Sequence, residues 1–438
     1  MGDLANSAAA PLRAPGAGSF SVPEGLEPVP GGGVASARGF SAAGVHAGFR
    51  ADPERLDLAL VVADAPCAAA GTFTKNVFCA APVTVCREHL GGVGYGSARA
   101  VVVNSGNANA ATGEPGLAAA RAVAGIVGDA AGCPPEEVLV ASTGVIGVHL
   151  PLEPFRTGVP AALSAASPAG GERAARAIMT TDTVPKQAAV RFEVEDGDLP
   201  ARTFTVGGMA KGSGMIMPDM ATMIAVLTTD APLSPDALHA ALVHAVAGSF
   251  NKVTVDSDTS TNDTCIALAS GAAAPAGAPA LAPEGPAFAR FQAALTYVCE
   301  SLARQMAADG EGASRLVTVR VSGAASDADA DRAARTVANS PLVKTAIAGR
   351  DANWGRIAAA LGRSGAAFAQ QDVDIDIMGI PVCRGGLALA FDEDEALRRF
   401  GLPEVAIDVD LGAGTAQTTI WTCDLTHEYI TINGDYRT

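Results

Sequence analysis

Apolar, β-branched runs alternate with amphipathic segments along most of this chain. Short apolar runs of strand length favour buried strands, and apolar residues at helical spacing favour helices. The pattern predicts strands at residues 56–64, 98–106, 136–143, 222–230, 315–323 and 372–379, and helices at residues 116–132, 170–182, 234–250, 287–310 and 352–365. Strands that alternate with helices are typical of an α/β fold built as a layered sheet-and-helix sandwich.

Two segments lack this periodicity. Residues 1–30 and 271–286 are rich in Ala, Gly and Pro, a composition that favours a flexible tail and a surface loop. Single cores seldom grow beyond about 250–300 residues. A chain of 438 residues therefore forms either one multilayer unit or two lobes.

The net charge of the chain argues against some classes of binding partner. The formal net charge is −16, and no cluster of Lys and Arg stands out, which argues against nucleic acid or an anionic membrane as the main partner. No apolar run reaches the roughly 18 residues that span a bilayer, and the first residues do not form a secretory signal. These features favour a small-molecule partner and predict a cytoplasmic protein.

Metal and nucleotide sites are not indicated. The eight cysteines contain no C-x-x-C pair, the six histidines are dispersed, and the Gly-rich turns lack the order of a phosphate-binding loop. The acidic stretch "TVDSDTSTNDT", residues 254–264, lacks the spacing of a calcium loop. We expect no cofactor and no metal, and we expect such polar loops to form hydrogen-bonded walls of a pocket.

The stretch "KGSGMIMPDMATMIAVLTTD" places Thr222 at the start of a predicted strand, behind a tight Gly-rich run. A Thr hydroxyl needs an adjacent base to act as a nucleophile, and its own α-amine can serve once Thr is the first residue of a chain. With a reference pKa of about 8, an α-amine is suited to this role. Exposure of that amine requires cleavage of the Ala221–Thr222 bond by an N-to-O acyl shift and hydrolysis. From the residues alone, an ordinary strand Thr remains the alternative.

Several ordered motifs carry a resemblance to a known family. They are "FTKNVFCAAPV", "VVNSGNANAATG", "STGVIG", "IMTTDTVPK", "KGSGMIMPDMATMIAVLTTDA", "TVDSDTSTNDT", "DGEGASRL", "DANWGRI" and "INGDYRT". In this order they are similar to segments of the ornithine acetyltransferase family, also called bifunctional glutamate N-acetyltransferase, of arginine biosynthesis. The resemblance runs from about Gly39 to the last residue.

The resemblance implies a self-cleaving acetyltransferase. An α chain of residues 31–221, behind the tail, and a β chain of residues 222–438 would stay associated, as an α2β2 heterotetramer or larger. Thr222 would carry the acetyl group from N-acetylornithine to glutamate in a ping-pong cycle. Some members also accept acetyl-CoA as a donor substrate, and the sequence leaves both donor patterns open.

The same resemblance implies the site residues. Thr143 and Gly144 match the oxyanion hole, which requires donors aimed at a developing negative charge; a simple turn with Gly144 at positive φ is the alternative. The positions that match the substrate-binding set are Thr180 (with Thr181 as the neighbouring alternative), Lys211, Thr222, Glu311, Asn433 and Thr438.

One departure and one rival class accompany this assignment. Met217 and Asp219 stand where many members of the family carry His and Asn, so no ring nitrogen is available there to assist cleavage. The rival class is an N-terminal-nucleophile aminopeptidase or amidase, which would send the acyl group to water rather than to an amino acid.

Overall fold

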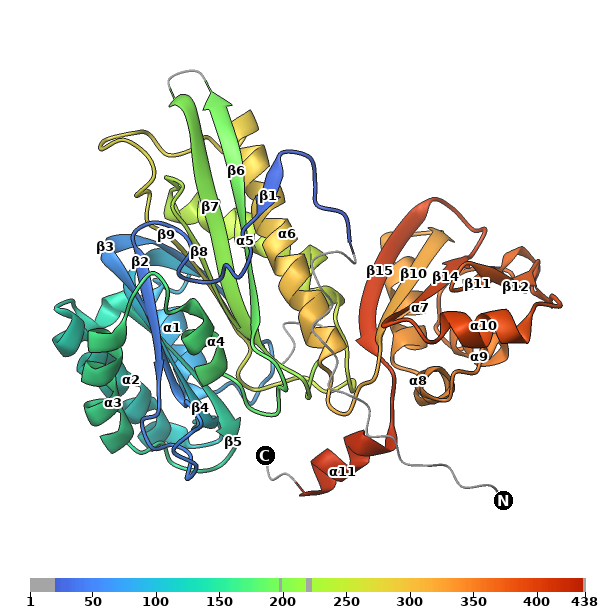
Figure 1. The fold of residues 1–438 in the computed structure, drawn as a ribbon, viewed down its shortest axis with the longest axis horizontal. Helices are drawn as coiled ribbons and strands as arrows, with labels where there is room; N and C mark the ends of the chain where they lie inside the picture. Colours follow the sequence, from blue (N-terminus) through green and yellow to red (C-terminus); the bar gives the residue numbers. More distant parts are fainter. Residues whose placement is uncertain (1–19, 197–198, 218–222, 436–438) are drawn as a thin grey trace. The chain divides into compact units, whose positions relative to one another are not determined.

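The computed structural model describes residues 20–196, 199–217 and 223–435, and its chain divides into two compact units. The larger unit contains residues 20–252 and 258–306, and the smaller unit contains residues 253–257 and the described residues from 307 onward. Each unit is built around its own β-sheet (Figure 1). The α/β class predicted from the hydrophobic pattern is confirmed.

The larger unit contains a nine-stranded mixed sheet in the order β1-β6-β7-β8-β9-β3-β4-β5, with β2 paired to β3. Its strands are β1 (Leu26–Pro28), β2 (Phe40–Val45), β3 (Leu58–Phe73), β4 (Tyr95–Asn107), β5 (Val138–Val145), β6 (Lys186–Asp196), β7 (Leu199–Lys211), β8 (Ile224–Thr229) and β9 (Thr264–Ala269). Its helices are α1 (Ala81–His89), α2 (Gly113–Ala131), α3 (Glu153–Ala165), α4 (Gly171–Ala177), α5 (Pro235–Gly248) and most of α6 (Pro286–Ala308).

Two glycines of β7, Gly207 and Gly208, allow a loop and a helix to pack directly on the two faces of this sheet. A Cβ at Gly208 would meet Leu227 and Leu302, so α6 packs directly on β7 and β8. A Cβ at Gly207 would lie 2.1 Å from the Gly33 carbonyl oxygen on the other face. Since adjacent strand residues point to opposite faces, the sheet is covered on both sides, which explains why all residues of β8 are buried.

The strand predicted at residues 222–230 is present as β8 and lies inside the larger sheet, between β7 and β9. β7 pairs antiparallel with β8, from Lys211↔Ile224 to Val206↔Thr229, and β8 pairs parallel with β9. Residues on the two sides of the Ala221–Thr222 bond thus contribute neighbouring strands to the same core.

Part of the segment predicted as a flexible tail, residues 1–30, is ordered in the described part of the chain. Leu26–Pro28 form β1 and pair with β6, and the Phe20 ring lies 4.9 Å from the ring of Tyr297 on α6. An aromatic ring and a short edge strand hold this segment against the larger unit. The Ala-, Gly- and Pro-rich composition did not predict this packing. Residues 271–285 contain no helix or strand.

The smaller unit contains a six-stranded sheet in the order β13-β12-β11-β14-β10-β15. Its strands are β10 (Leu316–Ala324), β11 (Asp374–Ile377), β12 (Ile380–Arg384), β13 (Leu387–Ala388), β14 (Glu404–Asp410) and β15 (Ala416–Cys423), and its helices are α7 (Asp327–Ala338), α8 (Pro341–Ala348), α9 (Trp354–Gly362), α10 (Glu393–Arg399) and α11 (His427–Asp435). Helix α7 packs against β10 and β15. Along β14, buried residues alternate with half-buried ones, as expected for a sheet with one covered face.

Candidate active site

Thr143 and Gly144 lie at the end of β5, beside the end of β4. In the parallel register, Thr143 pairs with Ser105 and Gly144 with Gly106. Gly144 has φ +131°, and a Cβ there would lie 2.4 Å from the backbone carbon of Gly106. Both the backbone conformation and the close approach therefore require glycine at this position.

An interlocked set of amides holds the end of β5 in place. The Asn262 side chain donates to the carbonyl oxygens of Ala108 (2.6 Å) and Ser142 (2.8 Å). The Ser142 hydroxyl donates to Asn104 Oδ1 at 2.7 Å, and Asn104 Nδ2 donates to the Asn107 carbonyl at 2.9 Å. These buried polar groups are hydrogen-bonded to one another, which makes the turn after β5 rigid.

Lys211 contacts Thr143 directly. Lys211 ends β7 and is 3% exposed, and its Nζ donates to Thr143 Oγ1 at 3.4 Å. An ammonium group can only donate, so the Thr143 hydroxyl accepts this bond and keeps its own proton available to another acceptor. A positive charge and a hydroxyl donor are thus brought together, as stabilisation of an oxyanion requires.

Asp182 is the hydrogen-bonding centre behind Lys211. Its Oδ1 accepts from Lys186 Nζ (2.6 Å) and from the Gly212 amide (2.7 Å), while Oδ2 accepts from the Thr180 amide (3.0 Å). Burial acts to raise the pKa of Asp182, but the charges of Lys186 and Lys211 and these hydrogen bonds hold the pKa well below its usual range. The carboxyl is therefore an anion that ties β7, β6 and the turn of Thr180 together.

Asp182 also explains why the helix predicted at residues 170–182 ends early. Helix α4 ends at Ala177, and the residues that follow turn so that their amides and carbonyls are bound by side chains. Arg50 donates to the Met179 carbonyl at 2.9 Å, and Arg55 donates to the Thr180 carbonyl at 3.0 Å.

The structure distinguishes the two neighbouring threonines. The Thr181 hydroxyl is hydrogen-bonded to the Ser213 hydroxyl at 2.7 Å, so it connects two loops. Thr180 is buried and its amide is held by Asp182, so the position of Thr180 is fixed through its backbone.

A second carboxyl, that of Asp263, lies at the start of β8. Asp263 precedes β9 and is fully buried, and its Oδ1 accepts from the Met223 amide at 3.0 Å. Burial raises the pKa of Asp263 well above its usual range, although the Met223 amide and the charge of Lys211 act in the opposite direction. Lys211 thus lies in the field of two carboxyls with opposite pKa shifts.

In the smaller unit, the structure brings two of the predicted residues together. Asn433 on α11 donates through Nδ2 to Glu311 Oε2 at 2.8 Å. The Thr426 hydroxyl donates to the Gly312 carbonyl at 2.6 Å, which fixes the start of α11 beside the Glu311 turn. Ala221, Thr222 and Thr438, like Asp219, lie outside the described residues.

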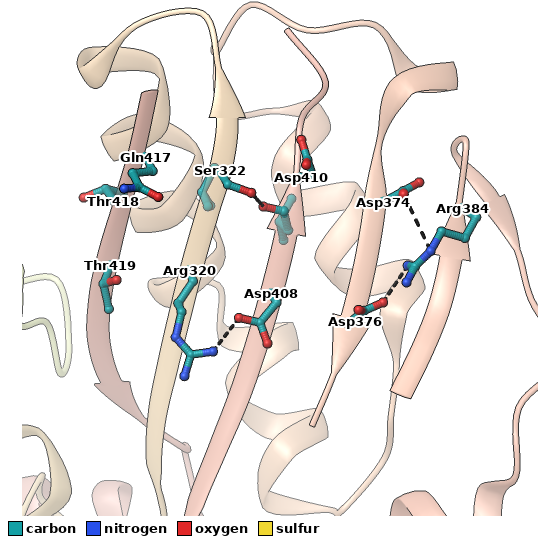
Figure 2. Close-up of a pocket in the computed structure, with 12 residues that line it drawn as sticks. Arg320, Ser322, Asp374, Asp376, Arg384, Asp408, Asp410, Gln417, Thr418 and Thr419 are labelled. Atoms are coloured by element: carbon teal, nitrogen blue, oxygen red, sulfur yellow. Dashed lines mark hydrogen bonds and ion pairs between the residues drawn. The ribbon is translucent and has the colours of Figure 1, made fainter. Parts of the chain in front are cut away.

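The face of the smaller unit's sheet contains a pocket of about 580 Å³, which none of the predicted site residues lines (Figure 2). Arg320 pairs with Asp408 at 2.5 Å, and Arg384 pairs with Asp376 at 2.5 Å. Because the two arginines are matched by carboxylates on neighbouring strands, this face is a solvated charge ladder rather than a convergent binding site.

Within the described residues, no group of three or more His, Cys, Asp or Glu side chains is arranged to hold a metal ion. The eight cysteines form no disulfide. Over the same part of the chain, no helix combines the length and apolar character that crossing a membrane requires.

The comparison with known proteins agrees with the motifs. The ArgJ family model matches residues 41–438. The arginine biosynthesis bifunctional protein ArgJ of Thermosynechococcus vestitus is 49% identical over 422 residues, covering 93% of this chain and 98% of that protein. Its counterpart from Symbiobacterium thermophilum is also 49% identical, over 408 residues, covering 93% and 99%.

Two solved structures carry related sequences. ArgJ from Bacillus halodurans is 43% identical, with a TM-score of 0.45, covering 48% of this chain and 97% of that chain. Ornithine acetyltransferase from Mycobacterium tuberculosis, complexed with ornithine, is 40% identical, with a TM-score of 0.39, covering 45% and 100%. The chain belongs to the ArgJ family, and the family expected from the motifs is confirmed.

Sequence reasoning did not single out Asp182 or Lys186, and it placed Asn262 and Asp263 only in a polar loop, residues 254–264, expected to form a wall of the pocket. All four lie within the quoted motifs. For Asp182, Lys186 and Asp263 the available signal was an ionisable residue beside an apolar run, because a charge that folds into a core needs a partner there.

Proposed function

We propose that this protein transfers the acetyl group of N-acetylornithine to glutamate through an ester on Thr222, and that it also accepts acetyl-CoA as a donor. Membership of the ArgJ family supports the activity. The observation that carries the proposal is the Lys211–Thr143 contact, which places a buried ammonium and a hydroxyl donor beside the strand that starts after Thr222.

Self-cleavage comes first in this scheme. Thr222 Oγ1 loses its proton as it attacks the Ala221 carbonyl carbon, the C–N bond breaks, and the nitrogen of Thr222 takes up that proton to become the α-amine. Water then hydrolyses the ester, which leaves a carboxylate on Ala221 and a free hydroxyl on Thr222. The pairing of β7 with β8 supports continued association of the α and β chains, which we propose assemble as an α2β2 heterotetramer or larger.

Acetyl transfer follows in two half-reactions. Thr222 Oγ1 attacks the acetyl carbonyl of N-acetylornithine, its proton passes through the α-amine to the leaving nitrogen, and ornithine departs. The amine of glutamate then attacks the ester, N-acetylglutamate departs, and the proton returns to Thr222. Thr143 and the Gly144 amide stabilise the oxyanion of each tetrahedral intermediate.

The remaining residues bind the substrate in this proposal. Lys211 binds negative charge, Thr180 lines the pocket, and Glu311 with Asn433 recognises the substrate's ammonium group, together with Thr438. The hydrogen bond between Glu311 and Asn433 supports a joint role for these two. No cofactor takes part, and we propose that the enzyme works in the cytoplasm.

A Thr222→Ala variant tests the proposal. The wild type should yield two fragments in denaturing mass spectrometry and release ornithine from N-acetylornithine over many turnovers only when glutamate is present, with the parallel initial-rate lines of a ping-pong mechanism. The variant should remain one inactive chain. Release of acetate at the same rate with or without glutamate would instead indicate a hydrolase.

A further inference from the structure

Three side chains hold the backbone on both sides of the Thr180 Cα. In the peptide unit before it, the Met179 carbonyl accepts from Arg50 Nη2 at 2.9 Å. The amide of the same unit, that of Thr180, donates to Asp182 Oδ2 at 3.0 Å. In the peptide unit after it, the Thr180 carbonyl accepts from Arg55 Nη2 at 3.0 Å. Because two planar peptide units meet at each Cα, these bonds fix both backbone dihedrals of Thr180 and the direction of its side chain.

The Thr180 hydroxyl differs from that of its neighbour. The Thr181 hydroxyl is hydrogen-bonded to Ser213 at 2.7 Å. Thr180 is only 9% exposed, and its hydroxyl makes no hydrogen bond to any residue that the structure describes. A Thr hydroxyl can both donate and accept, and polar side chains of buried residues usually have a partner. Of the two threonines, Thr180 is therefore the one whose hydroxyl can bind a ligand.

The loop that carries both arginines is itself anchored. Arg50 and Arg55 lie between β2 and β3, and Asp57, which is 0% exposed, accepts from the amides of Ala47 (2.6 Å) and Arg50 (3.0 Å). The Arg55 carbonyl oxygen lies 2.9 Å from His46 Nδ1, and since a carbonyl can only accept, the ring nitrogen donates. Both guanidinium groups thus extend from a loop whose backbone is fixed by buried or half-buried side chains.

Asp182 connects the Thr180 turn to the predicted site. Besides the Thr180 amide, it accepts from the Gly212 amide at 2.7 Å. The preceding residue, Lys211, donates to Thr143 at 3.4 Å. The direction of the Thr180 side chain is therefore fixed relative to the end of β7, where Lys211 and Thr143 meet.

We propose that Arg50 and Arg55 are positioning residues for Thr180: they fix its backbone so that its hydroxyl binds a polar group of the amino-acid substrate. This inference rests on the proposed function, because it assumes that Thr180 contacts the substrate. Neither arginine touches the substrate in this account, since each acts through Thr180.

Arg55 gives the sharper test of this proposal. Arg50 also donates to Ser105 Oγ at 3.4 Å, so its loss would disturb the end of β4 as well. Arg173 offers a matched control, because it is exposed like Arg55 and its Nε donates to a backbone carbonyl, that of Gly44, at 3.3 Å. This bond joins α4 to β2 and does not involve Thr180.

The experiment is a double-mutant cycle on kcat/KM for N-acetylornithine. Arg55→Met and Arg173→Met are each compared in the wild type and in a Thr180→Val background, which lacks the hydroxyl but keeps the shape. Thr180→Val should lower kcat/KM by about 3–10-fold, the usual effect of one hydrogen bond.

Arg55→Met should cause a loss of the same size in the wild type, mainly through a higher KM, as for lost substrate binding. In the Thr180→Val background it should cost less than about twofold more, because residues that act through one another are not additive. Arg173→Met should leave kcat/KM within about twofold in both backgrounds.

Equal losses from Arg55→Met in both backgrounds would overturn the inference, as would no loss in the wild type or an unchanged kcat/KM in Thr180→Val. If Arg55→Met does not fold, Arg55→Gln carries the same cycle, because its shorter side chain withdraws the donor from the Thr180 carbonyl. A wild type that releases no ornithine in the presence of glutamate would instead overturn the proposed function, so the two failures are distinguishable.

Discussion

The charged side chains around Lys211 are buried, whereas those on the open face of the smaller unit's sheet lie largely in water. Lys186 and the Asp182 carboxyl are 0% exposed, while the side chain of Arg320 is 51% exposed and that of its partner Asp408 is 38% exposed. The distances within the two pairs are nearly equal, at 2.6 Å and 2.5 Å. Contact distance alone therefore does not show what an ion pair contributes.

Burial makes the difference because water screens exposed charges and because ordering long exposed side chains costs entropy. In the buried cluster each carboxylate and ammonium group depends on its partner, since a lone charge in a core is strongly unfavourable. A rigid arrangement of charges is what a catalytic site requires. The exposed pairs in Figure 2 instead lie on neighbouring strands in contact with water, where ion pairs contribute little to stability.

Removal of one buried partner should have the largest effect. Lys186→Met leaves the Asp182 carboxylate without its closest cation, and breaking a buried pair in this way destabilises proteins by about 3–5 kcal/mol. Urea unfolding followed by circular dichroism should show a correspondingly lower midpoint. An unchanged midpoint would mean that Asp182 is not held as an anion by Lys186.

Loss of the charge next to Thr143 should affect catalysis more than folding. Lys211→Met is expected to lower kcat/KM for N-acetylornithine and glutamate by about 10–10²-fold, because it removes a substrate-binding ammonium and a hydrogen bond to a charged group contributes about 1.5–3 kcal/mol. Ornithine release measures the change, and a chain that melts like the wild type serves as the folding control. Activity within a few-fold of the wild type would remove Lys211 from the site.

In acid, the buried carboxylate of Asp182 should make the free energy of unfolding depend on pH. Its folded pKa lies below the unfolded value of about 3.9, so its contribution to stability is present above about pH 4 and is lost as pH falls through the folded pKa. The free energy of unfolding of Asp182→Asn should start lower at pH 7 and fall less steeply below about pH 4. Parallel pH curves for the variant and the wild type would contradict the assigned pKa shift.

The exposed pair should show the smallest effect. Arg320→Ala removes the partner of Asp408 on the open sheet face, where exposed pairs contribute about 0–1 kcal/mol. Both the unfolding midpoint and ornithine release should stay near the wild-type values. A loss as large as that of Lys186→Met would show that burial is not the decisive difference.

The sequence predicted the strand that carries Thr143 and the strand that follows Thr222, because long apolar runs between turn residues leave little choice of structure. It did not predict that helix α4 stops at Ala177, because that end is set by hydrogen bonds from Asp182, Arg50 and Arg55 in the folded protein. Helix propensity alone contains no information about such distant partners.

The candidate active site, too, could be predicted only in part, because local sequence does not show which distant groups will meet. Thr143, Gly144 and Lys211 could be assigned from motif resemblance, and the structure brings Thr143 and Lys211 into contact. The roles of Asp182 and Asp263 could not be assigned from local sequence, because each depends on groups more than 25 residues away: Gly212 for Asp182 and Met223 for Asp263.

The central claim is that Thr222 carries the acetyl group. The direct measurement is intact mass spectrometry of the denatured enzyme after incubation with N-acetylornithine and no glutamate. The account predicts that the fragment starting at Thr222 gains the mass of one acetyl group and that added glutamate removes it. A fragment that stays unmodified, or an acetyl group located on any residue other than Thr222, would contradict the mechanism.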